Sequence, residues 1–316
     1  MVLGRTADGL FWMFRYLERS ENTARLVGAG LRIALTRSRS GAEEWSSIIS
    51  TAGATDAFLA RHQGYEFDGV VDFMLRDRSN PSSVMSLIEA ARNNARAVRT
   101  ALTSEVWEAT NETWMSLRNA LKTPVTHHGL PEVLSLIRQQ SAYVRGALHG
   151  TMLRNEMFNF ARLGTFLERA DNTARILDVK YYVLLPSVVH VGAPIDNVQW
   201  ETILRSVSAE HSYDWLNEGD PDPAGIASFL IVDGRMPRSM AFCCNQILEN
   251  LRHLESDLPN PAPSPSLTLA EELTSSLRSR DINEVLEEGL HEFIQEFISR
   301  LGDLGGQIET DYRFHA

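Results

Sequence analysis

Apolar residues recur every three or four positions along almost the whole chain, and almost no stretch alternates between apolar and polar residues. A period near 3.6 is typical of helices that pack one face against a core, whereas alternation is typical of strands. The longest uninterrupted pattern covers residues 9–37, and a second covers residues 158–185, where Pro186 ends it. The sequence therefore predicts an all-α fold, a helical bundle.

Local signals place the ends of several helices. Asn80 followed by Pro81 predicts a helix start, because Asn is a favoured cap and Pro is favoured at the first helical position. Ser104 predicts the next start, and Thr6 or Asp8 is available to cap the first helix. The other expected helices cover residues 42–54, 55–61, 67–75, 81–102, 104–122, 131–148, 267–278 and 282–312.

One nine-residue motif occurs twice. Residues 17–25 read L-E-R-S-E-N-T-A-R and residues 167–175 read L-E-R-A-D-N-T-A-R, with seven of the nine positions identical. Later segments also match in the same order, for example F-M-L-R-D-R-S-N-P-S-S from Phe73 with F-L-I-V-D-G-R-M-P-R-S from Phe229. Self-similarity at a nearly fixed offset indicates a duplicated unit. We expect tandem helical repeats, residues 1–150 and 151–316, which pack about a pseudo-twofold axis.

The motif puts polar groups on a partly apolar helix face. At about 100° per residue, Glu18, Asn22 and Arg25 fall in one sector together with Phe11 and Phe14. The second copy repeats this arrangement. If the two motif helices pack antiparallel, Glu18 lies opposite Arg175 and Glu168 lies opposite Arg25. Arg15, Arg19 and Arg169 lie on neighbouring sectors, where a charged side chain is usually on the surface.

The motif leaves two interpretations open. In the first, the charges form a buried, fully paired network that fixes the register of the helices, a role that buried polar groups can have. In the second, they line a cleft and hold an anionic group, for which the fork of an arginine is suited. The candidate binding residues are Glu18, Arg19, Asn22, Arg25, Glu168, Arg169, Asn172 and Arg175.

The composition argues against two classes of binding partner, nucleic acids and membranes. A net charge of −11 over 316 residues argues against nucleic acid as a partner, because binding to phosphates needs clustered Lys and Arg. No segment reaches the roughly 20 apolar residues of a membrane helix, and no signal-peptide pattern opens the chain. We therefore expect a cytoplasmic protein without a membrane partner.

No pattern in the sequence indicates a metal or a cofactor. The only two cysteines, Cys243 and Cys244, are neighbours and lack the C-x-x-C spacing of a zinc or redox site, so we expect them to be reduced and buried. Glu288 and His291 have the spacing of one ligand pair of a di-iron site, but such a site needs a second pair. We expect no bound metal and no cofactor.

Several motifs together resemble the bacterial alpha-E domain family. They are L-G-R-T-A-D-G-L-F-W, R-Y-L-E-R-S-E-N-T-A-R, A-R-N-N-A-R-A-V-R and S-E-V-W-E-A-T-N, and the resemblance extends along essentially the whole chain. Members of this family are helical and carry a Glu-Arg motif, here Glu18-Arg19 and Glu168-Arg169. The resemblance also implies a setting, because members are encoded beside or fused to ATP-grasp proteins, often with a transglutaminase-like protein and sometimes with a peptidase.

Two functions of different kinds follow. In the leading hypothesis, the chain is a non-catalytic helical partner of an ATP-grasp amide or peptide ligase, which binds the ligase or presents its peptide substrate. In the rival, it is an enzyme in which Glu18 and Glu168 act as acid and base while Arg25 and Arg175 hold a carboxylate or phosphate. A plain scaffold that forms a homo-oligomer is a third interpretation.

Overall fold

The computed structural model describes residues 3–36, 42–184, 194–217, 222–256 and 263–314, and every regular element within these ranges is a helix. The all-α prediction is confirmed. The helices are α1 (Gly4–Thr36), α2 (Ala42–Thr51), α3 (Thr55–Leu59), α4 (Phe67–Leu75), α5 (Val84–Ala97), the 3₁₀ turn η1 (Arg99–Ala101), α6 (Ser104–Ala120), α7 (Leu130–Thr151), α8 (Glu156–Leu184), α9 (Pro194–Ser206), α10 (Glu210–Asp214), α11 (Pro223–Ile231), α12 (Met240–Ser256), α13 (Pro265–Arg278), α14 (Ile282–Glu288) and α15 (Leu290–Asp311).

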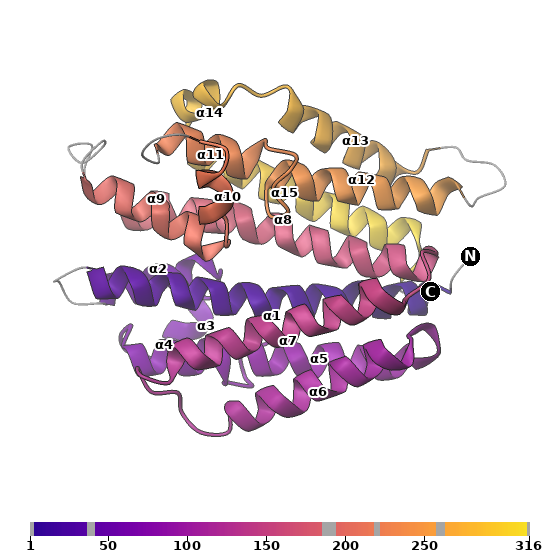
Figure 1. Cartoon of the computed structure of the whole chain (residues 1–316), viewed down its shortest axis with the longest axis horizontal. Helices are drawn as coiled ribbons and strands as arrows, with labels where there is room; N and C mark the ends of the chain where they lie inside the picture. Colours follow the sequence, from indigo (N-terminus) through magenta and orange to yellow (C-terminus); the bar gives the residue numbers. More distant parts are fainter. Residues whose placement is uncertain (1–2, 37–41, 185–193, 218–221, 257–262, 315–316) are drawn as a thin grey trace.

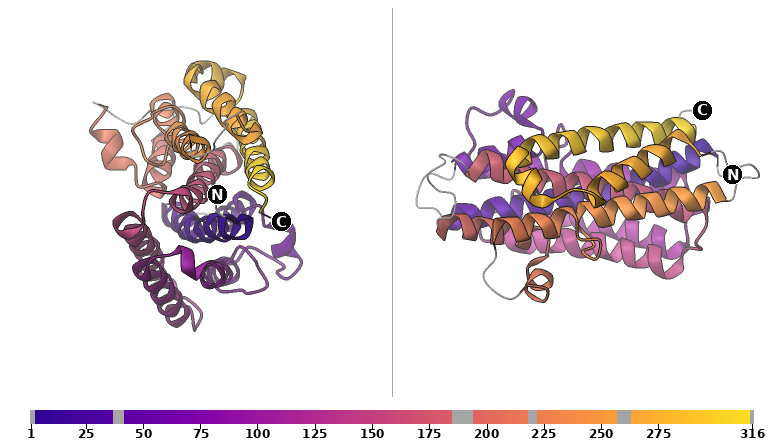
Figure 2. Two further views of the ribbon diagram at one scale, coloured as in Figure 1. Left: turned by 90° about the vertical axis from the view of Figure 1, so that its right-hand side faces the viewer. Right: turned by 90° about the horizontal axis from the view of Figure 1, so that it is seen from above.

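The long helices form two groups of four. In the first group, α5 and α7 pack on α1, and α6 covers both of them. In the second group, α12 and α15 pack on α8, and α13 covers both of them. Figure 1 shows the groups one above the other, with α1 and α8 at the contact between them, and Figure 2 shows the same arrangement end on. The contact between α1 and α8 therefore forms the centre of the molecule.

Both central helices are buried on almost all sides, because each contributes side chains to two hydrophobic clusters. Phe11 of α1 packs with Phe160 and Phe314 in a cluster formed largely by residues after position 160. Phe14, less than one turn later, belongs to a second cluster formed by residues 13–161. A helix that is apolar on most of its circumference needs protein on every side. The predicted boundary at residue 150 stays a prediction, although each cluster draws mainly on one half of the chain.

The two central helices run parallel, so the antiparallel packing that would place Glu18 opposite Arg175 does not occur. Gly164 of α8 lies against Phe11 of α1, and Arg169 lies against Glu18 further along both helices. Contacts that advance in the same direction along two helices mean that the helices point the same way, as Figure 1 also shows. The spacing within a helix fixes which residues share a face, but it does not fix the direction of the helix that covers this face.

Gly164 allows α1 and α8 to come close together. A Cβ atom added to Gly164 would overlap the carbonyl oxygen of Phe11. A residue without a side chain is needed where one backbone approaches another so closely. This close approach brings the charged residues that follow on both helices within hydrogen-bond distance of one another.

Several helix ends differ from the sequence-based expectation. The first helix begins at Gly4, so Thr6 and Asp8 lie inside it. Ser83 caps α5 by accepting a hydrogen bond from the backbone N–H of Ser86, whereas Asn80 donates to the carbonyl of Phe73 and closes the preceding turn. Thr103, and not Ser104, caps α6, because its hydroxyl accepts from the N–H of Val106. Neighbouring capping residues compete, and tertiary contacts decide which one is used.

The final helical pattern is interrupted at Gly289. Its φ of 119° ends α14 and begins α15. An L-residue with a side chain rarely adopts this conformation, and glycine does so without strain. The expected continuous element over residues 282–312 is therefore two helices. Pro186, expected to end the second long helix, lies outside the described residues.

No helix in the described part of the chain is long and apolar enough to cross a lipid bilayer.

Candidate functional site

The Glu-Arg motifs of α1 and α8 pair reciprocally across the contact between the two helices. Arg169 donates from Nε and Nη2 to the two carboxylate oxygens of Glu18, both at 2.9 Å. Arg19 donates in the same way to Glu168, with 2.8 Å from Nη2 to Oε2. Glu18 is 1% exposed and Glu168 is 3% exposed. A two-pronged arginine–carboxylate pair fixes geometry as well as charge, so this contact fixes the register of α1 against α8.

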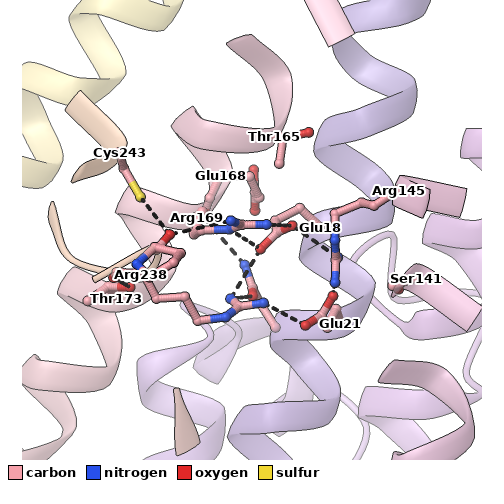
Figure 3. A network of polar contacts seen from close by, with 12 residues as sticks. Glu18, Glu21, Ser141, Arg145, Thr165, Glu168, Arg169, Thr173, Arg238 and Cys243 are labelled. Atoms are coloured by element: carbon pink, nitrogen blue, oxygen red, sulfur yellow. Dashed lines mark hydrogen bonds and ion pairs between the residues drawn. The ribbon is translucent and has the colours of Figure 1, made fainter. Parts of the chain in front are cut away.

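Around Glu18 the charge layer extends to other helices. Arg238, which precedes α12, donates to Glu18 at 3.2 Å and to Glu21 at 2.6 Å. Arg145 of α7 also contacts both carboxylates. Figure 3 shows these guanidiniums converging on Glu18 and Glu21 from three directions. Four elements of the fold are therefore tied together at one buried place.

The residues expected to face each other do not do so. Arg25 pairs with Glu21 of its own helix, at 2.7 Å, and reaches the hydroxyl of Ser208 at 2.8 Å. Arg175 pairs with Asp171 of its own helix, at 2.7 Å. Neither arginine reaches the carboxylate predicted for it, because the parallel packing of α1 and α8 places these arginines at the same end of the contact.

Arg15, Arg19 and Arg169 are not ordinary surface charges. Arg15 donates to Glu168 at 3.1 Å, so Glu168 is held by two arginines of α1. Arg169 is 9% exposed and bonds to Glu18. The register of the parallel helices turns these three arginines toward the contact between α1 and α8, which we call the seam. The spacing of residues in the sequence does not determine this register.

The two asparagines of the motif differ. Asn22 donates to the backbone carbonyl of Glu168 and accepts from Arg238, both at 3.4 Å. Asn172 is 8% exposed, and within the described residues its Nδ2 atom has no hydrogen-bond partner. A buried donor without a partner costs free energy. Such a donor in a native protein calls for an explanation, and a ligand that accepts this hydrogen bond is one.

Burial and charge set the ionisation of the layer. Burial alone would raise the pKa of Glu18, but the guanidiniums of Arg169, Arg238 and Arg145 hold this pKa well below its ordinary value of 4.5. The pKa of Glu168 is likewise lowered by Arg19 and Arg15 against the effect of burial. Both carboxyl groups are therefore ionised at neutral pH.

A pocket of about 270 Å³ opens on one side of the seam. Arg19 and Asn172 line it from the two central helices, together with Asp171 and Arg175. Its other wall comes from α2, α4 and the turn before α5, and it includes Ser82 and Gly53. The side chains of Arg19 and Arg175 are 31% and 39% exposed. The pocket thus presents two accessible guanidiniums and the unpartnered amide of Asn172.

A family model described as "a predicted alpha-helical domain with a conserved ER motif" matches residues 2–312. The chain belongs to the alpha-E family. The reciprocal pairs of Glu18 with Arg169 and of Arg19 with Glu168 involve both copies of the ER dipeptide. The alpha-E motif therefore has a clear structural role in this chain, which is to join its two central helices.

Two curated relatives of the chain carry the name "uncharacterized protein" and come from Mycobacterium bovis and Mycobacterium tuberculosis. Each is 25% identical to this chain over 310 residues, which covers 90% of this chain and 33% of the relative. The chain thus spans about one third of the length of these relatives. No solved structure matches the chain.

Sequence reasoning missed important members of the alpha-E charge layer. Arg238 bonds to Glu18, Glu21 and Asn22, although it lies far from the motif in the sequence. Glu21 is fully buried and bonds to Arg25, Arg145 and Arg238. One signal existed, because the segments M-P-R-S and N-P-S-S align and differ at a single charged position, Arg238 against Ser82.

The described part of this alpha-E chain shows no group of three or more His, Cys, Asp or Glu side chains that could hold a metal ion. Cys243 and Cys244 are both buried and free, as expected. Burial raises the pKa of Cys243 to about 12, so its thiol is protonated at neutral pH. A protonated, buried thiol is neither a good nucleophile nor a metal ligand.

Proposed function

We propose that this protein is a non-catalytic helical component of an amide or peptide ligase system of the ATP-grasp type, which binds a carboxylate of the peptide substrate at the seam between α1 and α8. The observation that carries the proposal is the seam pocket, defined by Arg19, Asn172, Arg175, Asp171 and Ser82, which holds a buried amide donor without a partner beside two accessible guanidiniums. The ligase setting comes from the resemblance to the alpha-E family.

The chemistry of the seam pocket favours a carboxylate. Arg19 already uses Nε and Nη2 on Glu168, and Arg175 uses Nε and Nη2 on Asp171. The donors left over are the Nη1 groups of both arginines and the Nδ2 of Asn172. These N–H groups suit a carboxylate, whose two oxygens each accept more than one hydrogen bond. The Nδ2 of Asn172 would then gain the acceptor that it lacks.

The size of the pocket favours the terminal residue of a peptide as the ligand. Pockets for complete small ligands usually measure about 300 to 1,000 Å³, and the seam pocket measures about 270 Å³. It would therefore hold one amino-acid-sized group and leave the rest of a peptide outside. Such an arrangement fits a protein that presents a peptide to another enzyme.

The proposal includes a gene duplication, with one repeat in residues 1–150 and the other in residues 151–316 about a pseudo-twofold axis. Under this relation, Ser82 corresponds to Arg238, and the seam pocket corresponds to the space that the guanidinium of Arg238 fills beside Glu18 and Glu21. The helices α7 and α15, both 22 residues long, would correspond as well. The small side chain of Ser82 would then explain why the seam pocket is open, whereas the corresponding space in the other repeat is filled by Arg238.

No observation favours the rival in which Glu18 and Glu168 act as acid and base. An efficient general acid or base has a pKa near the working pH, and the pKa of both carboxyl groups is lowered. Partners of the proposed system are an ATP-grasp ligase and, as further members, a transglutaminase-like protein or a peptidase. The cytoplasm is the proposed location.

Binding of a carboxylate can be tested directly. The probes are N-acetyl-alanyl-alanine and its C-terminal amide, titrated calorimetrically into the full chain at constant ionic strength. The acid should bind, and the amide should bind at least tenfold more weakly. Methylguanidinium serves as a cationic probe. Equal binding of acid and amide, or binding of methylguanidinium alone, would refute the carboxylate assignment.

The ligase partnership needs a separate experiment. The protein is mixed with an ATP-grasp ligase encoded in the same genome, and complex formation is measured by size-exclusion chromatography together with the rate of ATP-dependent ligation. We expect a complex and a faster ligation rate. Absence of both effects would remove the proposal, and self-association of the chain without either effect would favour a plain scaffold.

A further inference from the structure

A second pocket, of about 430 Å³, lies away from the seam pocket, where the end of α7 and the beginning of α8 meet α12. Its lining includes Arg154, Arg162 and His149 on one side and Gln246 and Glu249 of α12 on the other. We call it the α7–α8–α12 pocket. None of its residues belongs to the seam pocket, and the proposed function does not use it.

Arg162 is the central group of this pocket. Its side chain is partly buried, and it donates to Nε2 of His149 at 3.1 Å and to the amide oxygen of Gln246. Within the described part of the chain, no carboxylate bonds to it. Burial and the nearby charge of Arg169 lower the pKa of Arg162 to about 10, so it still carries its charge at neutral pH. A partly buried cation with only neutral partners is the arrangement that an anion would complete.

Arg154 stands in a similar situation. It donates to the backbone carbonyls of Met152 and His149, at 2.9 and 2.7 Å, and its guanidinium lies 4.0 Å from the ring centre of Phe158. No carboxylate among the described residues bonds to it either. Two arginines of one pocket thus keep their full charge without an acidic partner.

A third donor lines the same pocket. Asn159 is 6% exposed and lines the pocket, and its side-chain amide makes no hydrogen bond within the described residues. The side-chain amide of Asn159 is therefore available to bond to a ligand in this pocket, beside the arginines.

In the described ranges of the chain, the one carboxylate that lines this pocket, Glu249, offsets the two arginines only in part. Glu249 is exposed and accepts a hydrogen bond from Nε2 of Gln246 at 2.7 Å. One carboxylate faces two arginines, so the lining keeps an excess of positive charge although the whole chain has a net charge of −11.

We propose that the α7–α8–α12 pocket binds the phosphate or diphosphate group of a small polar ligand, held by Arg162, Arg154 and the amide of Asn159. Two guanidiniums and several neutral amides match an anion that carries many acceptor oxygens and two or more charges. The proposal is confined to the phosphate group, because the phenyl ring of Phe158 in the lining already lies against the guanidinium of Arg154.

The protonation of His149 gives an independent signal. Partial burial and the charges of Arg162, Arg154, Arg145 and Arg169 lower the pKa of His149 to about 4. The exposed groups His253 and Glu249 also face this pocket. A bound dianion would offset the arginine charges, so the pKa of His149 should rise toward its ordinary value of 6.5.

The test is a calorimetric titration of the full chain with inorganic pyrophosphate and with sulfate, at constant ionic strength. Pyrophosphate should bind with a stoichiometry of one, and Arg162→Gln and Arg154→Gln should each weaken binding at least tenfold. Arg154 is exposed, so its variant keeps the test valid if Arg162→Gln does not fold. Arg96→Gln is the control, because Arg96 is exposed on α5 and the substitution removes the same charge. It should leave the affinity unchanged.

The histidine signal completes the test. The pKa of His149 is measured by NMR, with the resonance assigned from a His149→Gln variant, in the presence and absence of saturating sulfate. A higher pKa with sulfate supports the site. Equal weakening by Arg96→Gln, an unchanged pKa of His149, or binding to anionic lipid vesicles without binding of free pyrophosphate would overturn it. Ser82→Arg, which fills the seam pocket, should not affect pyrophosphate binding. This variant therefore distinguishes binding at the α7–α8–α12 pocket from binding at the seam pocket.

Discussion

Arg169 of α8 donates two hydrogen bonds of 2.9 Å to Glu18 of α1, and both residues are more than nine-tenths buried. The reverse pair, Arg19 with Glu168, lies beside it. A charge in the interior is stable only when its partner and its hydrogen bonds are in place. The two reciprocal ion pairs of the ER motifs therefore hold the two central helices of this alpha-E protein in one register.

Neutralising Glu18 should destabilise the protein strongly. In Glu18→Gln, the guanidiniums of Arg169 and Arg238 stay buried but lose the negative charge that they face. We expect the free energy of unfolding to fall by about 3 to 5 kcal/mol, measured by urea denaturation. Glu112→Gln on the exposed face of α6 is the control and should change it by less than about 0.5 kcal/mol. A loss as small as that of the control would show that the network contributes little.

The same network predicts acid sensitivity. The pKa of Glu18 in the folded protein lies well below its ordinary value of 4.5, so the unfolded chain binds this proton more readily than the folded chain. The stabilisation is complete above pH 4.5 and is lost progressively as the pH falls below it. Glu18→Gln should make the unfolding free energy flatter between pH 5 and pH 3. An equally steep decline in this variant would assign the acid sensitivity to other groups.

Ser82→Arg should close the seam pocket. A guanidinium at position 82 would lie near Asn172 and Asp171, as the guanidinium of Arg238 lies near Asn22 and Glu21. We expect binding of N-acetyl-alanyl-alanine to weaken at least tenfold while the complex with the ligase still forms and the faster ligation rate is lost. Ser279→Arg, at an exposed position after α13, is the control and should change neither.

Unchanged peptide binding in Ser82→Arg would place the carboxylate elsewhere. If the ligation rate stays high although peptide binding is lost, the pocket does not present the substrate.

Gly164→Ala should separate the two central helices. The added methyl group would overlap the carbonyl oxygen of Phe11, and the backbones would have to move apart. Overpacking of this kind costs about 1 to 3 kcal/mol. In Gly302→Ala, on the exposed side of α15, the new methyl group meets no atom within 4 Å. This control should stabilise the helix by about 0.5 to 1 kcal/mol. Thermal melts of both variants should therefore shift in opposite directions, and a shift in the same direction would contradict the close approach.

The sequence alone determined the helical class, the two long helices and the presence of a polar layer on their buried faces. These features depend on residues three or four positions apart, and the periodicity of a helix places such residues on one face whatever surrounds it. For this reason the repeated motif was sufficient to identify Glu18 and Glu168 as candidate site residues.

Only the tertiary structure decided the direction of α1 against α8, the partners of each charge and the position of the pockets. Arg238 bonds to Glu18 across 220 residues of sequence, and local spacing carries no information about such a contact. The parallel direction turned Arg169 toward Glu18 and left Arg175 beside Asp171. A pocket is open or filled according to which distant side chain reaches it, and that depends on how complete helices pack.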